Sequence, residues 1–126
     1  VNPRVYAKKT QSKIELAVFK ELSAVLPGIS QSIRLYNPYY GPYDFGSLER
    51  KKLIEFYGSY WHADPLMYGP KHFFKQKNMT ASLIWSRDSA KRTYAEVRGF
   101  SVYVIWESRW RKEKAQIIAE LRAWWS

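Results

Sequence analysis

The amino-acid sequence predicts an α/β protein, in which a mixed β-sheet is flanked by helices and the elements follow the order α-β-β-β-α-β-α. Three observations lead to this prediction. Segments in which apolar residues recur at helical spacing alternate with short runs rich in β-branched and aromatic residues. Proline and glycine punctuate these segments, and no repeat or low-complexity linker divides the chain. A length of 126 residues, 46% of them hydrophobic, suits one core better than two.

The first part of the chain is predicted to hold an arm, a helix and three strands. Residues 1–11 are basic and unpatterned, as in an arm or the end of a linker, whereas residues 12–126 are expected to form one domain. Ser12 and Glu15 have the S-x-x-E spacing of a capping box, and Pro27-Gly28 is expected to end the helix that they begin. The predicted strands lie at 32–36, 43–48 and 52–57.

The second part is predicted to hold a loop, two helices and one strand. Residues 62–78 contain two prolines and a glycine, and are expected to form a loop with room for a helical turn. Apolar residues at helical spacing predict a helix over 80–98, which Gly99 ends. The β-branched run SVYVIW, 101–106, predicts a buried strand, and 112–125 predicts a closing helix.

The composition favours a polyanionic partner. Lys and Arg outnumber Asp and Glu by 21 to 11, and 17% of the residues are aromatic, more than a small core needs. Nucleic acid is therefore the first expectation, and an anionic membrane surface or acidic partner the second. The absence of cysteine excludes disulfides and thiolate metal sites. Without an apolar run of spanning length or a leader-like segment, we expect an intracellular protein; because it opens with Val1, we expect part of a longer one.

Two predicted neighbouring strands each carry a carboxylate. Asp44 interrupts the strand Tyr43 to Leu48, and Glu55 shares a face of the next strand with Leu53 and Tyr57. If the strands form a hairpin, the two carboxylates converge at one rim of the sheet, where they would make a hard oxygen site for Mg²⁺. The alternative is that both acids pair with Lys or Arg on a solvated face.

Three further residues have both a chemical and a structural interpretation. His62 follows a strand, and imidazole is suited to proton transfer near neutral pH, although a lone histidine is more often a filler. Asp88 could orient such a histidine ring, or could form an i,i+4 ion pair with Arg92. Glu15 is explained by its position in the capping box when pattern alone is considered.

Taken together, these residues resemble a known nuclease family. Asp44, the segment IEFYGSYWH at 54–62, the pair Arg87-Asp88 and the segment GFSVYVIWE at 99–107 are similar to the very-short-patch-repair (Vsr) endonucleases. These form a branch of the PD-(D/E)xK superfamily that includes phage homing endonucleases with an EDxHD motif. The resemblance covers roughly residues 12–110. It implies a restriction-endonuclease-like core and metal-dependent hydrolysis of phosphodiester bonds in double-stranded DNA.

The resemblance also implies roles for individual residues. Glu15 would be the first-helix acid of the motif, Asp44 the metal-binding aspartate, and Phe56 the residue whose backbone carbonyl is a metal ligand. His62 and Asp88 would be the catalytic histidine and the final aspartate, so that His62 takes a proton from the attacking water. The implied cofactor is Mg²⁺ or Mn²⁺.

Two further positions of the motif, both on the third predicted strand, are occupied by Glu55 and Tyr57. Glu55 occupies the superfamily's second acidic position, and is a further candidate for catalysis and for metal binding. Tyr57 stands where many relatives carry lysine. The usual role of that lysine, which is to position or deprotonate water, is expected to fall to His62.

The departures from the family narrow the expected function. Repair enzymes of the family have a Cys- and His-rich zinc site with a histidine run after the W-H pair, whereas Ala63-Asp64-Pro65 follows here. We therefore expect no structural zinc, and a catalytic domain of a phage homing endonuclease, working inside a bacterial host with a separate DNA-targeting domain. A Vsr-type repair nicking enzyme and a non-catalytic nucleic-acid-binding module are the alternatives.

Expected DNA contacts come from aromatic and basic residues. Tyr60 and Trp61 match the positions of aromatic wedges that enter the base stack in the repair enzymes, although Trp61 could instead cap the core. The basic residues should together give a steep salt dependence of binding. The candidates for phosphate contacts are Lys51, Lys52, Lys71, Lys75, Arg109 and Arg111.

Overall fold

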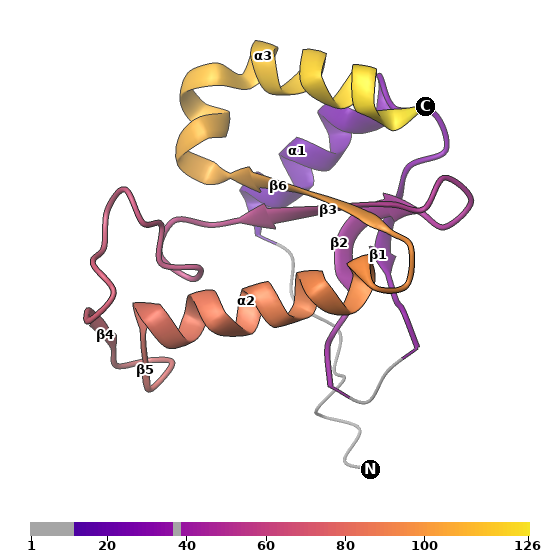
Figure 1. The fold of residues 1–126 in the computed structure, drawn as a ribbon. Coiled ribbons are helices and arrows are strands. Elements are labelled where there is room, and N and C mark those ends of the chain that lie inside the picture. Colours follow the sequence, from indigo (N-terminus) through magenta and orange to yellow (C-terminus); the bar gives the residue numbers. More distant parts are fainter. Residues whose placement is uncertain (1–11, 37–38) are drawn as a thin grey trace.

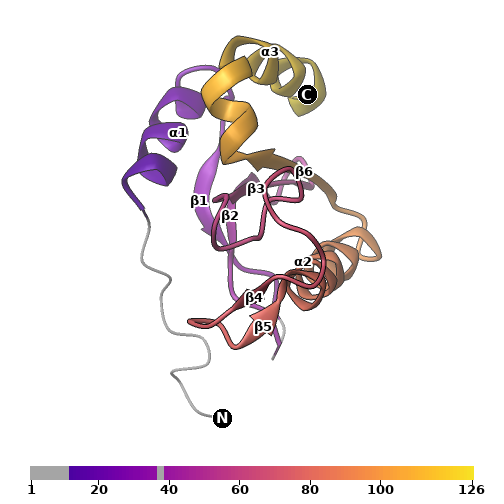
Figure 2. The same cartoon turned by 90° about the vertical axis from the view of Figure 1, so that its left-hand side faces the viewer.

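Three helices enclose a four-stranded sheet in the computed structural model, which describes residues 12–36 and 39–126. Helices α1 and α3 lie on one face of the sheet and α2 lies on the other (Figures 1 and 2). The α/β class with a mixed sheet is therefore confirmed. The arm predicted at 1–11 lies outside the described residues.

Helix α1, Lys13–Ser23, begins where the capping box predicts. The Ser12 hydroxyl oxygen accepts a hydrogen bond from the Glu15 N–H at 3.2 Å, which satisfies one of the donors left open in the first helical turn. The helix ends at Ser23, before the predicted stop at Pro27-Gly28. Gly28 then turns the chain with a φ of +78°, a conformation that costs glycine little.

The sheet has the strand order β1-β2-β3-β6. Strands β1 to β3 are antiparallel neighbours, while β6 runs parallel to β3 after the crossover through α2, so the sheet is mixed. The first strand begins and ends earlier than the predicted 32–36, and the other three agree closely with their predictions. The four strands are Ser30–Ile33, Tyr43–Ser47, Lys52–Tyr57 and Ser101–Trp106.

The prediction that SVYVIW forms a buried strand is wrong. This segment is β6, the edge strand next to β3, and Ile105 is its one buried residue. The buried centre of the sheet is instead formed by β2 and by β3, whose residues are buried except for the half-buried Lys52. A β-branched run reports a good fit to a pleated surface, and does not report how many neighbours a strand has.

The region 62–78 was expected to be a loop, and this expectation is wrong in part. It contains the strand β4, Phe73–Phe74, which pairs with β5, Met79–Thr80, in a short antiparallel hairpin. Phe74 is buried with Ala81 and Ile84, which fixes the hairpin against the first turn of α2 (Figure 1). Strands of two residues carry too little pattern to be seen in a sequence.

The remaining helices are α2, Ala81–Glu96, and α3, Glu107–Trp125. Gly99, with a φ of +91°, lies just beyond α2 as predicted. The start predicted for α3, at residue 112, is wrong because the helix begins directly after β6 and continues through a kink at Glu113, whose φ of −132° is not helical. The kink lets the second part of α3 lie back over the sheet (Figure 1).

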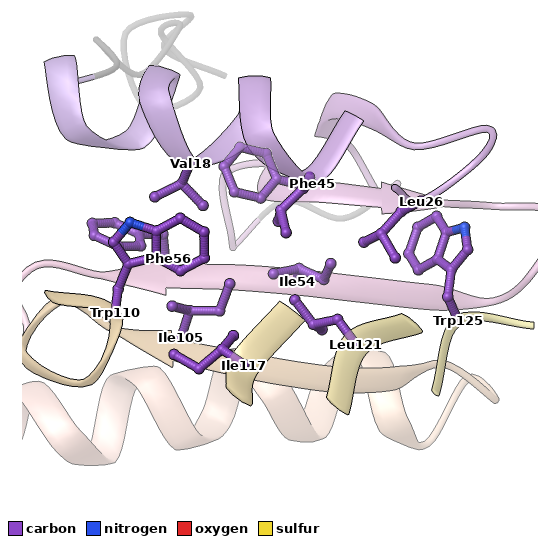
Figure 3. Close-up of a cluster of buried hydrophobic side chains, with 11 residues drawn as sticks. Val18, Leu26, Phe45, Ile54, Phe56, Ile105, Trp110, Ile117, Leu121 and Trp125 are labelled. Carbon is purple, nitrogen blue, oxygen red and sulfur yellow. The ribbon is translucent and has the colours of Figure 1, made fainter. Parts of the chain in front are cut away.

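Two apolar layers hold the sheet between the helices. The larger cluster joins α1 and α3 to Phe45, Ile54, Phe56 and Ile105 of the sheet (Figure 3). A smaller cluster on the opposite face includes Leu53 of the sheet and Ala95 of α2. Among the described residues, no helix has both the length and the apolar character needed to cross a bilayer.

Candidate active site

The two mid-strand carboxylates meet between β2 and β3, as the predicted hairpin requires. Asp44 accepts a hydrogen bond from the Phe56 N–H through Oδ2 at 2.7 Å, and Glu55 accepts one from the Asp44 N–H through Oε1 at 2.9 Å. Both carboxylates are buried. These side-chain contacts join the two strands beyond their last backbone pair, Phe45 with Ile54. The expected convergence of Asp44 and Glu55 is therefore confirmed.

Glu55 forms an ion pair with a lysine of helix α2. The Lys91 ammonium lies 3.0 Å from Glu55 Oε2, and also donates to the Pro42 carbonyl at 2.8 Å. Its charge lies above the Tyr43 ring, 4.6 Å from the ring centroid. The alternative that the two acids pair with Lys or Arg on a solvated face is correct in part: Glu55 pairs with a lysine, but the Glu55–Lys91 pair is largely buried. Each Glu55 oxygen already has a partner.

His62 and Asp88 form a contact that links the loop after β3 to α2. His62 Nδ1 lies 2.8 Å from Asp88 Oδ2, and the imidazole stacks on the Tyr57 ring at a centroid distance of 4.1 Å and an angle of 6°. Arg92, which was a candidate partner of Asp88, donates to the Tyr57 hydroxyl at 3.0 Å. Of the two roles considered for Asp88, the contact with the histidine ring is the one observed.

Tyr57 supports the histidine ring and is a weak acid. Burial, reinforced by the nearby Glu55 and Asp88 carboxylates, raises the pKa of the Tyr57 phenol well above its usual range. The phenol therefore stays protonated at neutral pH, and does not supply the positive charge of a lysine. What Tyr57 contributes is a flat surface that fixes the plane of the His62 imidazole.

A cleft of about 390 Å³ collects three of the candidate residues. Glu15 of α1, Phe56 of β3 and His62 of the following loop all line it. The other lining residues are Ser12, Ile14, Gly58, Trp61 and Glu107. Asp44 and Glu55 are not among the lining residues and lie buried in the sheet, and Asp88 lies behind His62. The first acid and the histidine therefore meet at one cleft, although they are far apart in the sequence.

Glu107 is a lining residue that the sequence reasoning missed as a site residue. Its Oε1 accepts from the Ser59 N–H at 3.0 Å, and its Oε2 accepts from Arg111. Burial opposes ionisation of Glu107, but these two partners outweigh it and hold the pKa below its ordinary value. The parallel pairing of Tyr57 with Trp106 brings the next residue beside Gly58, so sheet register was the missing signal.

Asp64 is a second residue that the sequence reasoning did not identify. It is 1% exposed, and its two oxygens accept from the Leu66 N–H at 2.9 Å and from the Ser108 hydroxyl at 2.6 Å. It therefore ties the loop that carries His62 to the first turn of α3. The D-P dipeptide after the histidine is a turn signal that could have indicated this role.

The side chains and carbonyls of the site decide how well it could hold the expected Mg²⁺ or Mn²⁺. Within the described part of the chain, no three His, Cys, Asp or Glu side chains are grouped so that they could share an ion. Asp44 and Phe56 are neighbours, and a carboxylate with a backbone carbonyl suits a hard cation that keeps several waters. Glu55 fits the role of metal ligand poorly, because its oxygens are engaged by Lys91 and by the Asp44 N–H.

The aromatic pair at the exit of β3 is accessible. Trp61 is 53% exposed and Tyr60 is 39% exposed, so the alternative that Trp61 caps the core is wrong. Tyr60 packs edge-on against Phe74, which anchors it on the β4–β5 hairpin. Lys77 of the hairpin donates to the Trp61 carbonyl at 2.7 Å and lies over the indole ring.

The six basic candidates for phosphate contacts fall into three groups. Lys71 and Lys75 are exposed on either side of strand β4, whose Phe74 contacts Tyr60. Lys51 and Lys52 lie at the start of β3, about 17 Å along the strand from Tyr57. Arg109 and Arg111 pair with Glu120 and Glu107, respectively.

Of these candidates, Arg111 contacts a lining residue of the cleft, Glu107, whereas Lys71 and Lys75 do not line it. Comparison with models of protein families, with curated proteins and with solved structures finds no match to this chain.

Proposed function

We propose that this chain is a metal-dependent endonuclease that hydrolyses phosphodiester bonds in double-stranded DNA, with a PD-(D/E)xK core of the Vsr and EDxHD type. The observation that carries the proposal is the His62–Asp88 contact of 2.8 Å at a cleft that Glu15 and Phe56 also line. A histidine oriented by a carboxylate is the arrangement expected of a general base.

The proton chemistry follows from the contact geometry. The Asp88 carboxylate can only accept, so Nδ1 of neutral His62 carries the proton and Nε2 is the basic nitrogen. Among the described residues, none hydrogen-bonds to Nε2. Stacking on Tyr57 fixes the plane of the ring, so Nε2 is held in one direction. His62 would accept a proton from a water molecule that attacks phosphorus.

Asp44 and the Phe56 carbonyl would hold Mg²⁺ or Mn²⁺, and Glu15, which lines the cleft together with Phe56, would hold water there. When bound, the ion would polarise the scissile phosphate and stabilise the leaving oxygen. Asp44 is already held by the Phe56 N–H, so its carboxylate needs little reorganisation. The Glu55–Lys91 pair would keep β2, β3 and α2 in position around it.

DNA is favoured as the substrate by charge and by exposed aromatic rings. A formal charge of +10 on 126 residues attracts a polyanion, and Tyr60 and Trp61 are accessible at the edge of the cleft. We further propose that the chain is the catalytic part of a phage homing endonuclease, acting in a bacterial host together with a separate targeting region.

Cleavage of supercoiled plasmid in Mg²⁺ or Mn²⁺ tests this proposal. We expect the unsubstituted protein to convert the plasmid to open-circular or linear form. We expect His62→Ala to slow cleavage by roughly 10²- to 10⁴-fold, the usual contribution of a general base. His72→Ala is the matched control, because His72 is the other histidine and is exposed on the hairpin. Cleavage by His62→Ala at the rate of His72→Ala would contradict the assignment.

A second pair of variants tests the acid on the first helix. We expect Glu15→Gln to reduce cleavage, with Glu21→Gln as its control on the same helix, where Glu21 forms an exposed pair with Lys114. Calorimetric titration with Mn²⁺ should show binding that Asp44→Asn removes. If the protein binds duplex DNA but none of these preparations cuts it, the chain is a non-catalytic binding module and the nuclease proposal fails.

A further inference from the structure

A second cleft, of about 320 Å³, lies on the Asp88 side of the His62–Asp88 contact. It lies between the segment before β2, the β4–β5 hairpin and helix α2. Its lining residues are Tyr39, Tyr40, Gly41, Lys77, Met79, Ile84, Arg87, Asp88 and Lys91. His62 lines the first cleft and its partner Asp88 lines the second, so the His62–Asp88 contact forms a common wall. Neither the sequence reasoning nor the proposed chemistry assigns a role to this space.

The charges around the second cleft favour an anion. Three of its lining residues are cationic and one is a carboxylate. Lys91 is balanced by Glu55, and Asp88 is held by His62. Arg87 differs from both, because its one contact within hydrogen-bonding distance among the described residues is with the Met79 sulfur, at 3.3 Å. A thioether is a weak acceptor, so the planar Arg87 guanidinium remains suited to a phosphate group.

The opposite wall of this cleft is aromatic. Tyr39 is 77% exposed and lies edge-on to Tyr40, with ring centroids 6.4 Å apart. Tyr40 in turn packs on Tyr94 of α2 at 5.5 Å, which anchors the pair on the helix. The exposed Tyr39 ring and the half-buried Tyr40 ring, beside a guanidinium, offer a stacking surface and an anion contact within one cleft. A nucleotide has both of the matching parts, a flat base and a phosphate.

We propose that the second cleft binds one nucleotide of the DNA strand, with its phosphate on Arg87 and its base against Tyr39 and Tyr40. The volume lies at the lower end of the range for ligand sites, about 300 to 1,000 Å³, and suits a single nucleotide. This proposal deepens the proposed endonuclease function, from which the identity of the strand is taken. It implies that the strand crosses the His62–Asp88 wall between the two clefts.

Binding of a fluorescent single-stranded DNA oligonucleotide, without divalent metal, tests the proposal separately from cleavage. We expect Arg87→Ala to weaken binding about tenfold, as removal of a charge-assisted hydrogen bond does. The slope of log affinity against log salt concentration should fall by about 0.7, the value for one phosphate contact on a single strand. Tyr39→Ala should also weaken binding, whereas Tyr39→Phe should not, because phenylalanine keeps the ring.

Three controls make the outcome decisive. Arg98→Ala removes a guanidinium from the C-terminal end of the α2 region, where Arg98 packs over Tyr94, and should leave the salt slope unchanged. His72→Ala, at an exposed position that does not line this cleft, should bind the oligonucleotide like the unsubstituted protein. Deoxyadenosine monophosphate used as a competitor distinguishes a free-nucleotide site from a strand site. Arg87→Ala with unchanged affinity and salt slope, or no binding of the oligonucleotide by the unsubstituted protein, would overturn the proposal.

Discussion

Glu55 is a carboxylate buried in the middle of a sheet, and such a group needs compensation close by. Water cannot reach it well, so its charge is balanced by the Lys91 ammonium at 3.0 Å and by the Asp44 N–H. The pair adds little net stability when it is intact, because both charges lose hydration on burial. Removal of one partner is strongly destabilising, because the remaining charge stays buried without its counterion.

Lys91→Met should therefore destabilise the protein by about 3 kcal/mol or more at neutral pH. The measurement is urea-induced unfolding, followed by tryptophan fluorescence. Lys114→Met is the control, because the Lys114–Glu21 pair is exposed and should cost less than about 1 kcal/mol. The double variant Glu55→Gln/Lys91→Met should recover much of the loss. Equal effects of Lys91→Met and Lys114→Met would show that the buried charge is not the cause.

Glu107 predicts a dependence of stability on pH. Its pKa is lower in the folded protein than in the unfolded chain, where it is about 4.5. A depressed carboxyl pKa stabilises the fold above that value, and the contribution is lost as the pH falls through the folded pKa. The stability difference between the unsubstituted protein and Glu107→Gln should thus shrink below about pH 4.5.

Unfolding by urea at a series of pH values between about 3 and 7 measures this difference. Glu96→Gln, at an exposed position of α2, is the control. A Glu107→Gln difference that stays constant over the whole range would contradict the role given to the Ser59 and Arg111 contacts.

At the level of elements, the β2–β3 hairpin is the framework of the candidate site, and Gly46 is its tightest point. A Cβ atom at Gly46 would lie 2.5 Å from the Lys52 carbonyl oxygen and 2.9 Å from the Leu53 side chain. One of these neighbours is backbone and cannot move away without a shift of the strand. The close approach of the two strands therefore depends on the missing side chain.

Gly46→Ala should destabilise the protein by about 2 kcal/mol or more, because overpacking in a buried strand forces the backbone to move. Gly69→Ala is the matched control, since nothing lies within 4 Å of the position of its Cβ. Thermal unfolding followed by circular dichroism measures both. A melting temperature of Gly46→Ala equal to that of Gly69→Ala would show that the hairpin can open without cost.

The sequence was most informative about features that depend on residues close together in the chain. The capping box located the start of α1, and the hairpin expected for β2 and β3 predicted that Asp44 and Glu55 would meet. It was less informative where an outcome depends on contacts between distant elements. The partner of Glu55 comes from α2, and the position of Glu107 depends on parallel pairing with β3. Neither is encoded in local spacing.

At the scale of the whole molecule, the distribution of positive charge is more informative than its sum. Lys71 and Lys75 are exposed around the β4–β5 hairpin, whose Lys77 lies over the Trp61 ring, whereas Lys51 and Lys52 lie at the start of β3, away from Trp61. If DNA covers the face that carries the clefts, only the first pair reaches phosphates. Each phosphate contact that is lost lowers the salt dependence of duplex binding by a fixed increment.

We therefore expect Lys71→Ala/Lys75→Ala to reduce the slope of log affinity against log salt concentration by up to about 1.8 for duplex DNA. Lys51→Ala/Lys52→Ala carries the same change of charge and should leave the slope almost unchanged. Fluorescence anisotropy at several salt concentrations provides the measurement. Equal slopes for the two double variants would mean that DNA does not favour the face carrying the clefts.

The ion pair between Glu55 and Lys91 has a consequence for the strand that carries Glu55. The resemblance places a lysine two residues after the second acid, on the same strand, but this chain has Tyr57 there and brings a cation to Glu55 from α2. A charge supplied from a neighbouring element leaves the strand position open to another residue, and here that residue supports the histidine ring. A buried carboxylate whose counterion comes from another element therefore leaves its own strand free to carry a side chain with a different task.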